Sequence, residues 1–337
     1  MMKLSKRKSW GIIAFIVLAL SILGCSSEKE KVTNMAEEIK LNSGAVLKNE
    51  EGSYKLYNFE NGKYESKKDS VVILAYDKES SSYICMENGK HFVVHNGYKN
   101  EIKDINYSEL KLSKGGEYIS YFIDDNGLKL KIFDTTKENK PIEMKSNVSI
   151  SGTLYDWYDD NTLVYYGVSD DGVNGLFTYN IKESKEELLY NIKEGYLAFL
   201  KGTDNNVIFI QLTLENKKQL MMIDKKTKDV KFLNDNIEEL SDIIVSNEKI
   251  YFTGKVSGNV NSLYELKDNV PKRLVFDFPA IVKIEKGLVV DENSNILFIG
   301  ANNLNDKQEQ IFTYSKDGSI SLISKNSTDY VFVEYNT

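Results

Sequence analysis

Two short β-forming segments recur in the same order five times along the chain, and this repeat restricts the fold more than any other feature. An aliphatic residue anchors the first segment of each repeat, and successive anchors stand 43 to 46 residues apart. An aromatic residue follows each anchor by two positions, and the second segment begins 11 to 15 residues after the anchor. The anchors are Ile119, Leu163, Val207, Ile250 and Ile296. A fixed period of this kind indicates repeated units that pack on their neighbours.

Each unit also contains one run before the first strand and a more polar run after the second strand. Four short strands in about 44 residues are typical of a β-propeller blade. The two middle strands are apolar on both faces, as expected where each sheet lies between two others. Residues 70–105 supply a further set of four strands, "SVVILAY", "SYICM", "KHFVVH" and "EIKDI".

The two ends of the repeat region complement each other. "GAVLK", "YKLYNF" and "KYESK" provide three strands without an innermost partner, and Tyr330–Glu334 provides one strand without a blade. Joining them closes a ring and leaves no open sheet edge. An open edge would favour aggregation. We therefore predict an all-β fold, a β-propeller of four-stranded blades closed by the C-terminal strand. Seven blades fit best, with six or eight as alternatives because the first two are irregular.

The N-terminus has the parts of a secretory signal. Residues 3–8 carry four basic residues and no acid, and the apolar run "GIIAFIVLALSILG" follows. That run is shorter than the ~20 residues needed to span a bilayer, and a basic head with a short apolar body is typical of a signal peptide. The run leads into Ile22, Leu23, Gly24 and Cys25. The alternative is an ordinary signal peptide whose cleavage region happens to contain a cysteine.

Residues 22–25 resemble the lipobox of bacterial lipoproteins, although Leu23 replaces the commoner Ala or Ser. The resemblance implies cleavage before Cys25 and lipidation of that residue with acyl chains such as palmitate. Two or more chains give stable membrane anchoring, whereas one chain gives only marginal binding. We expect a signal peptide at 1–24, the lipidated Cys25 with a flexible charged tether at 25–43, and the propeller at 44–337. The predicted location is the outer face of the cytoplasmic membrane of a Gram-positive-like bacterium.

The charge balance limits the partners. The chain has 50 Asp and Glu against 43 Lys and Arg, and four of the basic residues belong to the predicted signal. An acidic surface repels nucleic acid, so no nucleic-acid partner is expected. Arg273 is the only arginine after the signal, which excludes clusters of bidentate donors for phosphate or sulfate.

The stretch "DWYDDNTLVYYG", residues 156–167, places Asp159 and Asp160 between two predicted strands. Two adjacent carboxylates could act as an acid–base pair, but Asp and Asn are also favoured in tight turns. We interpret both as turn residues. The stretch, with Trp157, Asp160 and Thr162-Leu163, resembles the TolB-like propeller repeat, as do Leu112-Ser113 and Gly116 in the preceding unit. Related repeats occur in dipeptidyl peptidase IV-like propellers, and no copy here retains their Pro. The resemblance implies a propeller in a family of largely unknown function.

Other candidate sites are weak. A Gly-x-Ser-x-Gly motif is absent. His91 and His95 lie four residues apart on one strand, so ~13 Å separates them at ~3.3 Å per residue, too far to share a zinc ion. The acidic segments 123–127 and 169–175 lack calcium-loop spacing and suit hairpin turns. Cys85 suits a buried inert thiol. We predict no catalytic, cofactor-binding or metal residue, no cofactor, and Cys25 as the one modified residue.

Binding is the remaining class of function. The longer hairpins between the two middle strands, at 168–175, 212–218, 255–262 and 301–310, share one face of the ring, where loops often bind partners. We expect a non-enzymatic, monomeric binding or scaffold module, held at the membrane by its N-terminal lipid, that docks a protein or a glycan. The alternatives are a single-domain propeller hydrolase or lyase with a metal at the channel mouth, and an accessory lipoprotein of an envelope complex.

Overall fold

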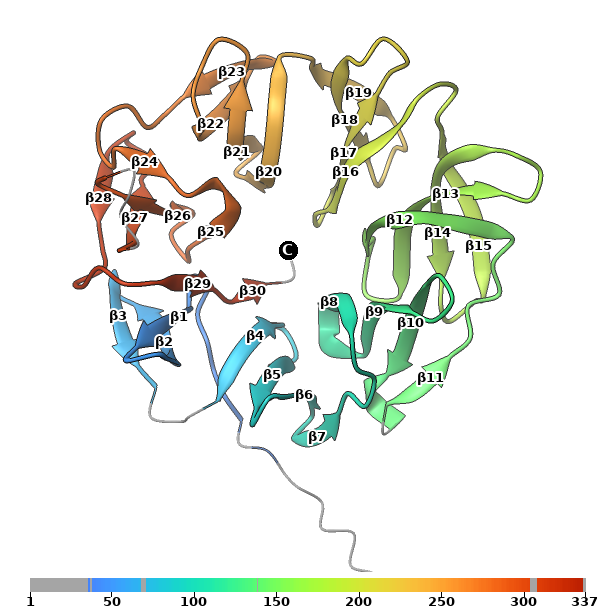
Figure 1. Cartoon of the computed structure of the whole chain (residues 1–337), viewed down its shortest axis with the longest axis horizontal. Helices are drawn as coiled ribbons and strands as arrows, with labels where there is room; N and C mark the ends of the chain where they lie inside the picture. The colour runs from blue at the N-terminus through green and yellow to red at the C-terminus, as the bar shows by residue number, and fades with distance from the viewer. Residues whose placement is uncertain (1–35, 37, 68–70, 138, 304–307, 336–337) are drawn as a thin grey trace, which may run out of the picture. The chain divides into compact units, whose positions relative to one another are not determined.

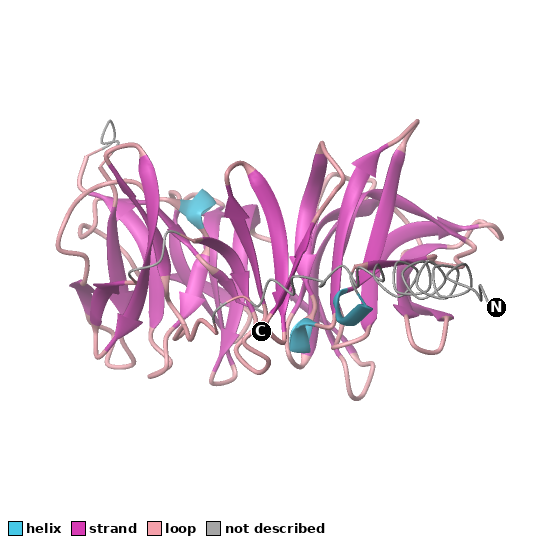
Figure 2. Cartoon of the chain, turned by 90° about the horizontal axis from the view of Figure 1, so that it is seen from below, coloured by secondary structure: helices cyan, strands magenta, loops and turns pink. Residues whose placement is uncertain are grey.

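The computed structural model of the chain describes residues 36, 38–67, 71–137, 139–303 and 308–335. The predicted signal and Cys25 lie outside these residues. Within them, seven sheets stand around a common centre as the blades of a β-propeller (Figure 1). The strands run between the two faces of the ring (Figure 2). The all-β, seven-bladed fold predicted from the repeat is thus confirmed. No helix in the described part of the chain is long and apolar enough to cross a membrane.

Each blade has its strands in chain order from the centre outward, apart from the strands added at closure. The first two blades contain β1 (Val46–Glu50), β2 (Ser53–Glu60) and β3 (Lys63–Ser66), then β4 (Val72–Tyr76), β5 (Tyr83–Glu87), β6 (Lys90–His95) and β7 (Tyr98–Glu101). The third and fourth contain β8 (Tyr107–Leu112), β9 (Tyr118–Asp124), β10 (Leu128–Asp134), β11 (Lys140–Ile142), β12 (Val148–Trp157), β13 (Thr162–Ser169), β14 (Asn174–Asn180) and β15 (Lys185–Asn191).

The fifth and sixth blades contain β16 (Tyr196–Gly202), β17 (Asn206–Leu212), β18 (Lys218–Asp224), β19 (Val230–Asn234), β20 (Ile237–Ser246), β21 (Lys249–Val256), β22 (Ser262–Lys267) and β23 (Val270–Arg273). The seventh contains β24 (Ile281–Val282), β25 (Leu288–Val290), β26 (Ile296–Ala301), β27 (Gln310–Tyr314) and β28 (Ile320–Leu322). Its innermost position is divided, because β24 and β25 both pair with β26. Three short 3₁₀ helices complete the fold: η1 (Lys114–Gly116), η2 (Thr135–Lys137) and η3 (Ile284–Lys286).

The C-terminal segment closes the ring, as predicted. Strand β29 (Tyr330–Phe332) pairs antiparallel with β1 and becomes the innermost strand of the first blade. The segment then continues as β30 (Glu334–Tyr335), which pairs parallel with β4 of the second blade. The single strand predicted for Tyr330–Glu334 is therefore two short strands that join two different blades. Val333 lies between them, fully buried, and its N–H donates to the carbonyl of Ala45 at 3.0 Å.

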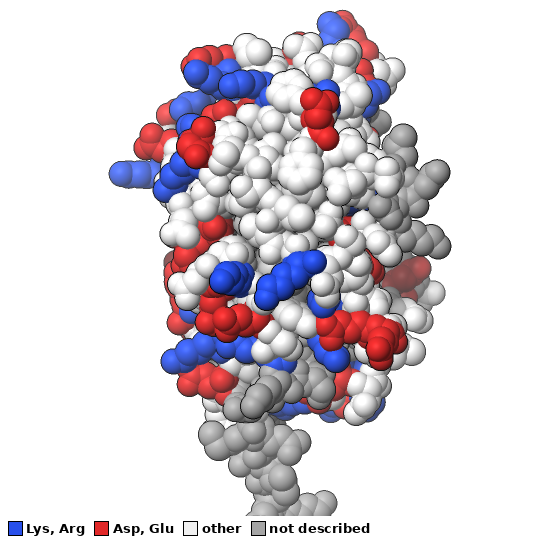
Figure 3. Space-filling view, turned by 90° about the vertical axis from the view of Figure 1, so that its left-hand side faces the viewer, with Lys and Arg blue, Asp and Glu red and all other residues white. Residues whose placement is uncertain are grey.

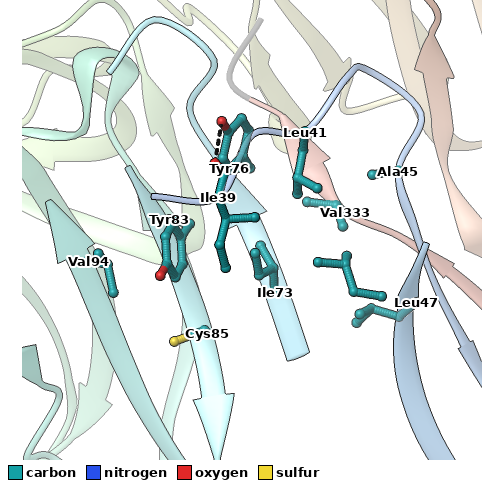
Figure 4. Packing of buried hydrophobic residues seen from close by; sticks show 11 residues of the cluster. Ile39, Leu41, Ala45, Leu47, Ile73, Tyr76, Tyr83, Cys85, Val94 and Val333 are labelled. Carbon is teal, nitrogen blue, oxygen red and sulfur yellow. Dashed lines mark hydrogen bonds between the residues drawn. The ribbon is translucent and has the colours of Figure 1, made fainter. Parts of the chain in front are cut away.

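The residues just before the first blade pack against the same joint. Ile39 and Leu41 are buried in a cluster that includes residues of β1, β4 and the C-terminal segment (Figure 4). Tyr76 donates from its hydroxyl to the carbonyl of Ile39 at 2.9 Å, and Tyr335 donates to the carbonyl of Asn42 at 2.6 Å. The tether expected at 25–43 thus differs in its last part, because these apolar side chains fill the space between the first two blades.

The outer strand of the second blade also differs from expectation. The predicted strand "EIKDI" begins at residue 101, whereas the observed strand β7 ends there. Asn96 and Gly97 have φ of 49° and 78°, the geometry of a two-residue hairpin turn that reverses the chain at once. The strand therefore starts directly after the Asn-Gly pair.

The aromatic residues that follow the repeat anchors form the buried layers between blades. All five are at most 1 % exposed, namely Tyr121, Tyr165, Phe209, Phe252 and Phe298. Burial of a large apolar side chain contributes ~1.5–3 kcal/mol, so the repeat detected in the sequence is the repeat of the core.

Cys85 on β5 is fully buried, and burial raises the pKa of its thiol to about 12. Because the thiolate is the reactive form, we expect no reaction with a thiol reagent at pH 8 in a chain that starts at Ser26, where Cys85 is the only cysteine. Full labelling should appear in denaturant. Rapid labelling of the folded chain would contradict the buried position.

Candidate functional site

Charged residues that the sequence analysis did not identify recur near the inner ends of the blades. They alternate in sign and lie 41 to 45 residues apart. We call this set the charged belt, and its members are Lys111, Asp156, Lys201, Asp242, Lys286 and Asp329. The first four lie on the innermost strands β8, β12, β16 and β20, Lys286 ends η3, and Asp329 precedes β29.

Asp156 joins three consecutive blades. Its Oδ1 accepts from Nζ of Lys111, in the preceding blade, at 3.1 Å. Its Oδ2 accepts from the backbone N–H of Gly202, in the following blade, at 2.9 Å. The side chains of Lys111 and Asp156 are only 18 % and 17 % exposed. Although burial acts to lower the pKa of Lys111, Asp156 and Glu334 raise it above its usual value, so Lys111 is an ammonium ion.

Asp242 repeats this geometry two blades later. Its Oδ1 accepts from Nζ of Lys201 at 2.5 Å, and its Oδ2 accepts from the backbone N–H of Leu288 at 2.8 Å. The third pair spans the closure, where Nζ of Lys286 lies 2.7 Å from Oδ1 of Asp329. The belt therefore links neighbouring blades from the third blade round to the first.

Irregularities in the inner strands precede the belt residues. The pairing register shifts between Ser108 and Lys111 in β8, and between Leu240 and Asp242 in β20. Similar shifts precede Asp156 in β12 and Lys201 in β16. A β-bulge changes the direction of the side chains that follow it, so the belt residues leave the simple inward–outward alternation of a strand.

We expect Asp242→Ala to lower the free energy of unfolding by about 2–3 kcal/mol. The change leaves a partly buried ammonium without its carboxylate and a backbone N–H without its acceptor. Denaturant unfolding would measure the loss. Asp125→Ala is the matched control, because Asp125 and Lys129 form an exposed pair, and exposed pairs contribute little. Equal effects of the two substitutions would contradict a stabilising belt.

A cavity of about 140 Å³ opens beside the belt. Its wall comes from the inner-strand ends of the third, fourth and fifth blades, from the turns that follow them, and from the C-terminal segment. Both signs of charge line it: Lys111, Lys114, Lys201 and Lys225 together with Asp156, Asp159, Asp160, Asp204 and Glu334. Such a wall suits a small polar ligand rather than an apolar one.

Most lysines of the cavity already have a carboxylate partner. Lys114 lies 3.1 Å from Oδ1 of Asp204, and Lys111 and Lys201 belong to the belt. Lys225 differs, because it donates only to the backbone carbonyls of Tyr158 and Thr203. Burial lowers its pKa to about 8.

Glu334 lines the cavity. It belongs to β30, which lies near the centre of the ring (Figure 1). Its side chain is accessible, and among the described residues it has neither an ion pair nor a hydrogen bond. The surrounding protein reduces its hydration and raises its pKa, while Lys111 and Lys201 oppose this effect.

Asp159 and Asp160 are confirmed as residues of a turn, and that turn also forms part of the cavity wall. Oδ1 of Asp159 accepts from the backbone N–H of Asn161 at 3.0 Å, and the N–H of Tyr158 donates to the carbonyl of Thr162 at 2.7 Å. These contacts close the chain reversal between β12 and β13.

The other weak candidates form structural contacts. His95 lies between Oγ of Ser82 and the amide of Asn96, at 2.8 Å from each. His91 contacts the hydroxyl of Tyr107. No group of three or more His, Cys, Asp or Glu in the described ranges is placed to hold a metal ion.

The cavity lies on the face opposite to the predicted partner loops. Its turns connect each innermost strand to the second strand, whereas the predicted hairpins connect the second and third strands. Because these strands are antiparallel, the two kinds of loop lie at opposite ends. The sequence did contain one signal for this site, the recurrence of Lys and Asp at nearly the blade period.

Comparisons with known proteins support the fold alone. No family model and no curated protein matches the chain. Among solved structures, the acylaminoacyl peptidase of Pyrococcus horikoshii has a TM-score of 0.56 at 14% identity over 86% of this chain. This chain covers 51% of that peptidase, about half its length.

Two further structures extend the comparison. An oligogalacturonate lyase from Vibrio parahaemolyticus has a TM-score of 0.52 at 11% identity, covering 84% of this chain and 85% of that one. TolB from Acinetobacter baumannii has a TM-score of 0.45 at 10% identity, covering 86% and 82%. At these identities the similarity concerns the fold alone.

Proposed function

We propose that the chain is a lipid-anchored extracytoplasmic lipoprotein that acts as a non-enzymatic binding module at the channel mouth. The observation that carries the proposal is the accessible cavity of mixed charge beside the charged belt. Ion pairs and backbone bonds between blades fix the wall, and a fixed wall lowers the entropy cost of ligand binding. The basic head, the apolar run and Cys25 supply the anchor.

Anchoring is tested with Cys25→Ala in the producing bacterium. The thiol is the acylation site at the processed end, so the variant should accumulate as a precursor or leave the membrane fraction. Cys85→Ala, which keeps Cys25, is the control and should remain a mature membrane species. A Cys25→Ala protein that still partitions into detergent as a mature chain would contradict the lipoprotein proposal.

Binding without catalysis is tested on the purified full-length chain. The competing function is a propeller hydrolase or lyase with a metal at the channel mouth. Elemental analysis should find no stoichiometric transition metal after dialysis. One tightly held metal ion per chain, lost when Asp156 or Glu334 is replaced, would favour the enzyme instead.

A further inference from the structure

An apolar surface lies where the sixth blade meets the seventh. The left-hand side of the ring in Figure 1, where the seventh blade stands, carries a broad area without charged side chains (Figure 3). Four large apolar side chains of these two blades and their loops are 42 % to 61 % exposed, namely Val260, Phe276, Phe278 and Leu322. We call this set the apolar edge. Single exposed apolar residues are ordinary, whereas a group of them marks a contact surface.

Phe278 connects the loop between β23 and β24 to the seventh blade. Its ring lies edge-on to the ring of Phe312, with ring centres 5.2 Å apart. Phe312 is fully buried and is paired with Leu322 across β27 and β28, so these two side chains share one face of the sheet. Phe312 belongs to the apolar layer between the two blades. Phe278 and Leu322 therefore extend that layer outward into solvent.

The same loop is fixed to the sixth blade beside Val260. The hydroxyl of Ser262, two residues after Val260, donates to the carbonyl of Val275 at 3.0 Å. Nε of Arg273 donates to the same carbonyl at 2.6 Å, and its Nη2 donates to the carbonyl of Phe276 at 3.2 Å. The guanidinium carbon lies 5.1 Å from the centre of the Phe276 ring. The loop thus holds Phe276 in an exposed position, and a surface fixed in this way loses little entropy on binding.

The segment 273–280 contains two charged residues of opposite sign, Arg273 and Asp277. Neither forms an ion pair with another residue in the described ranges. A guanidinium has five N–H donors, and the two backbone carbonyls leave Arg273 with donors for a carboxylate. Lys272 precedes Arg273 in β23, so its side chain points to the other face of that strand. The segment therefore offers one donor group and one acceptor group on either side of Phe276.

A second copy of the chain fits this arrangement. In a two-fold contact the same surface of each copy meets the other, so that residue i contacts residue j and j contacts i. Two segments 273–277 that lie antiparallel would bring Arg273 of one protomer to the partner's Asp277, and symmetry supplies the reverse pair. The exposed aromatic rings then pack on each other at the centre, where interfaces are enriched in aromatic residues and arginine.

A membrane surface fits less well. Asp277 lies between the two exposed phenylalanines, so their insertion would carry a carboxylate toward anionic headgroups, which repel it. The chain also enters the fold elsewhere, because the N–H of Ala36 donates to the carbonyl of Gly97 at 2.7 Å. Gly97 belongs to a turn between the third and fourth strands of the second blade, on the cavity face. The apolar edge includes the hairpin at 255–262, which lies on the opposite face.

We propose that the apolar edge joins two copies of the chain about a two-fold axis, with Arg273 of each protomer bonded to the partner's Asp277. This dimer replaces the monomer expected from the sequence. It leaves the cavity accessible, because the cavity lies on the other face of each ring.

Sedimentation velocity of the chain that starts at Ser26 tests the proposal in buffer without detergent. The compact unit that contains the whole propeller begins at Ala36, so this chain keeps every contact described above. The mass should rise from one chain to two between about 1 and about 100 µM, since a contact centred on a few apolar side chains gives a Kd on the order of micromolar.

Phe276→Ser should raise the dimer Kd about tenfold or more, because a central aromatic side chain carries much of the energy of an interface. Phe232→Ser is the matched control, since Phe232 is also exposed but lies on β19 of the fifth blade. It should leave the dimer Kd unchanged. Melting temperatures verify that both variants are folded.

A charge exchange tests the ion pairs. Asp277→Lys should raise the dimer Kd about tenfold or more, because it places like charges together across the axis, and Arg273→Glu should do the same. An equimolar mixture of these two variants should dimerise again, since opposite charges then meet at both ends. If Arg273→Glu does not fold, Phe276→Cys replaces it. Position 276 lies near the axis, so this variant should form a disulfide-linked dimer under mild oxidation, whereas Phe232→Cys should not.

Three results would overturn the inference. The first is the mass of one chain throughout the concentration range. The second is a dimer that both Phe276→Ser and Asp277→Lys leave intact, and the third is a folded mixture of the charge variants that stays monomeric. Flotation of a monomeric chain with phosphatidylcholine vesicles, lost in Phe276→Ser, would assign the edge to lipid instead. None of these results depends on Cys25, so the anchor proposal is tested separately.

Discussion

Deletion of residues 330–337 should unfold the whole propeller and not only its last strand. The first blade loses its innermost strand β29, and the second blade loses β30. Tyr330, Phe332 and Val333 are at most 9 % exposed, and each buried side chain of this size contributes ~1.5–3 kcal/mol. Their sum is comparable with the ~5–15 kcal/mol that stabilises a typical domain. Circular dichroism on heating should show a lost or much less cooperative transition.

A single substitution provides the control for the deletion. Val331 alternates with the buried residues of β29 and is 38 % exposed. Val331→Ala should therefore change the free energy of unfolding by no more than ~0.5 kcal/mol. A deleted chain that melts at the temperature of the parent would show that the C-terminal strands do not hold the ring closed.

Trp157→Ala should cost ~3–5 kcal/mol, the usual range for truncation of a large buried aromatic side chain. Trp157 ends β12, is 9 % exposed and stacks on Tyr118 of the preceding blade, with ring centres 6.1 Å apart. The substitution thus opens a void between two blades. Denaturant unfolding followed by circular dichroism would measure the loss.

Trp157→Phe should cost clearly less. It keeps an aromatic ring in the gap, and the indole N–H that it removes has no hydrogen-bond partner within the described ranges. Phe232→Ala is an external control, because Phe232 on β19 is 47 % exposed. A Trp157→Ala chain as stable as the Phe232→Ala chain would place Trp157 outside the core.

The sequence predicted the ring because blade packing follows a simple rule. The anchors and the aromatic residues two positions later face neighbouring sheets, so their apolar character recurs at the blade period. The junction between the first two blades and the C-terminal segment was harder to predict from the sequence. Val333 is buried between β29 and β30, and one continuous apolar run concealed two short strands that serve different blades.

The candidate site was missed for a physical reason. Lys111, Asp156, Lys201 and Asp242 follow bulges, so they do not fit the alternation from which burial is judged. Lys and Asp are also ordinary surface residues, and an isolated one carries no signal. Only their spacing near the blade period distinguishes them. Lys225 and Glu334 do not follow this spacing. Both line one cavity only because closure of the ring brings the C-terminal segment to the third, fourth and fifth blades.

Closure by β29 and β30 also determines when the ring can form during synthesis of the chain. A chain is synthesised from its N-terminus, and its early segments begin to fold first. Here the first blade stays one strand short until Tyr330–Phe332 has been made, and contacts between such distant segments form slowly. The ring therefore forms only after residues 330–335 have been made. Until then the first and second blades each lack an inner strand, and the joint between them stays open.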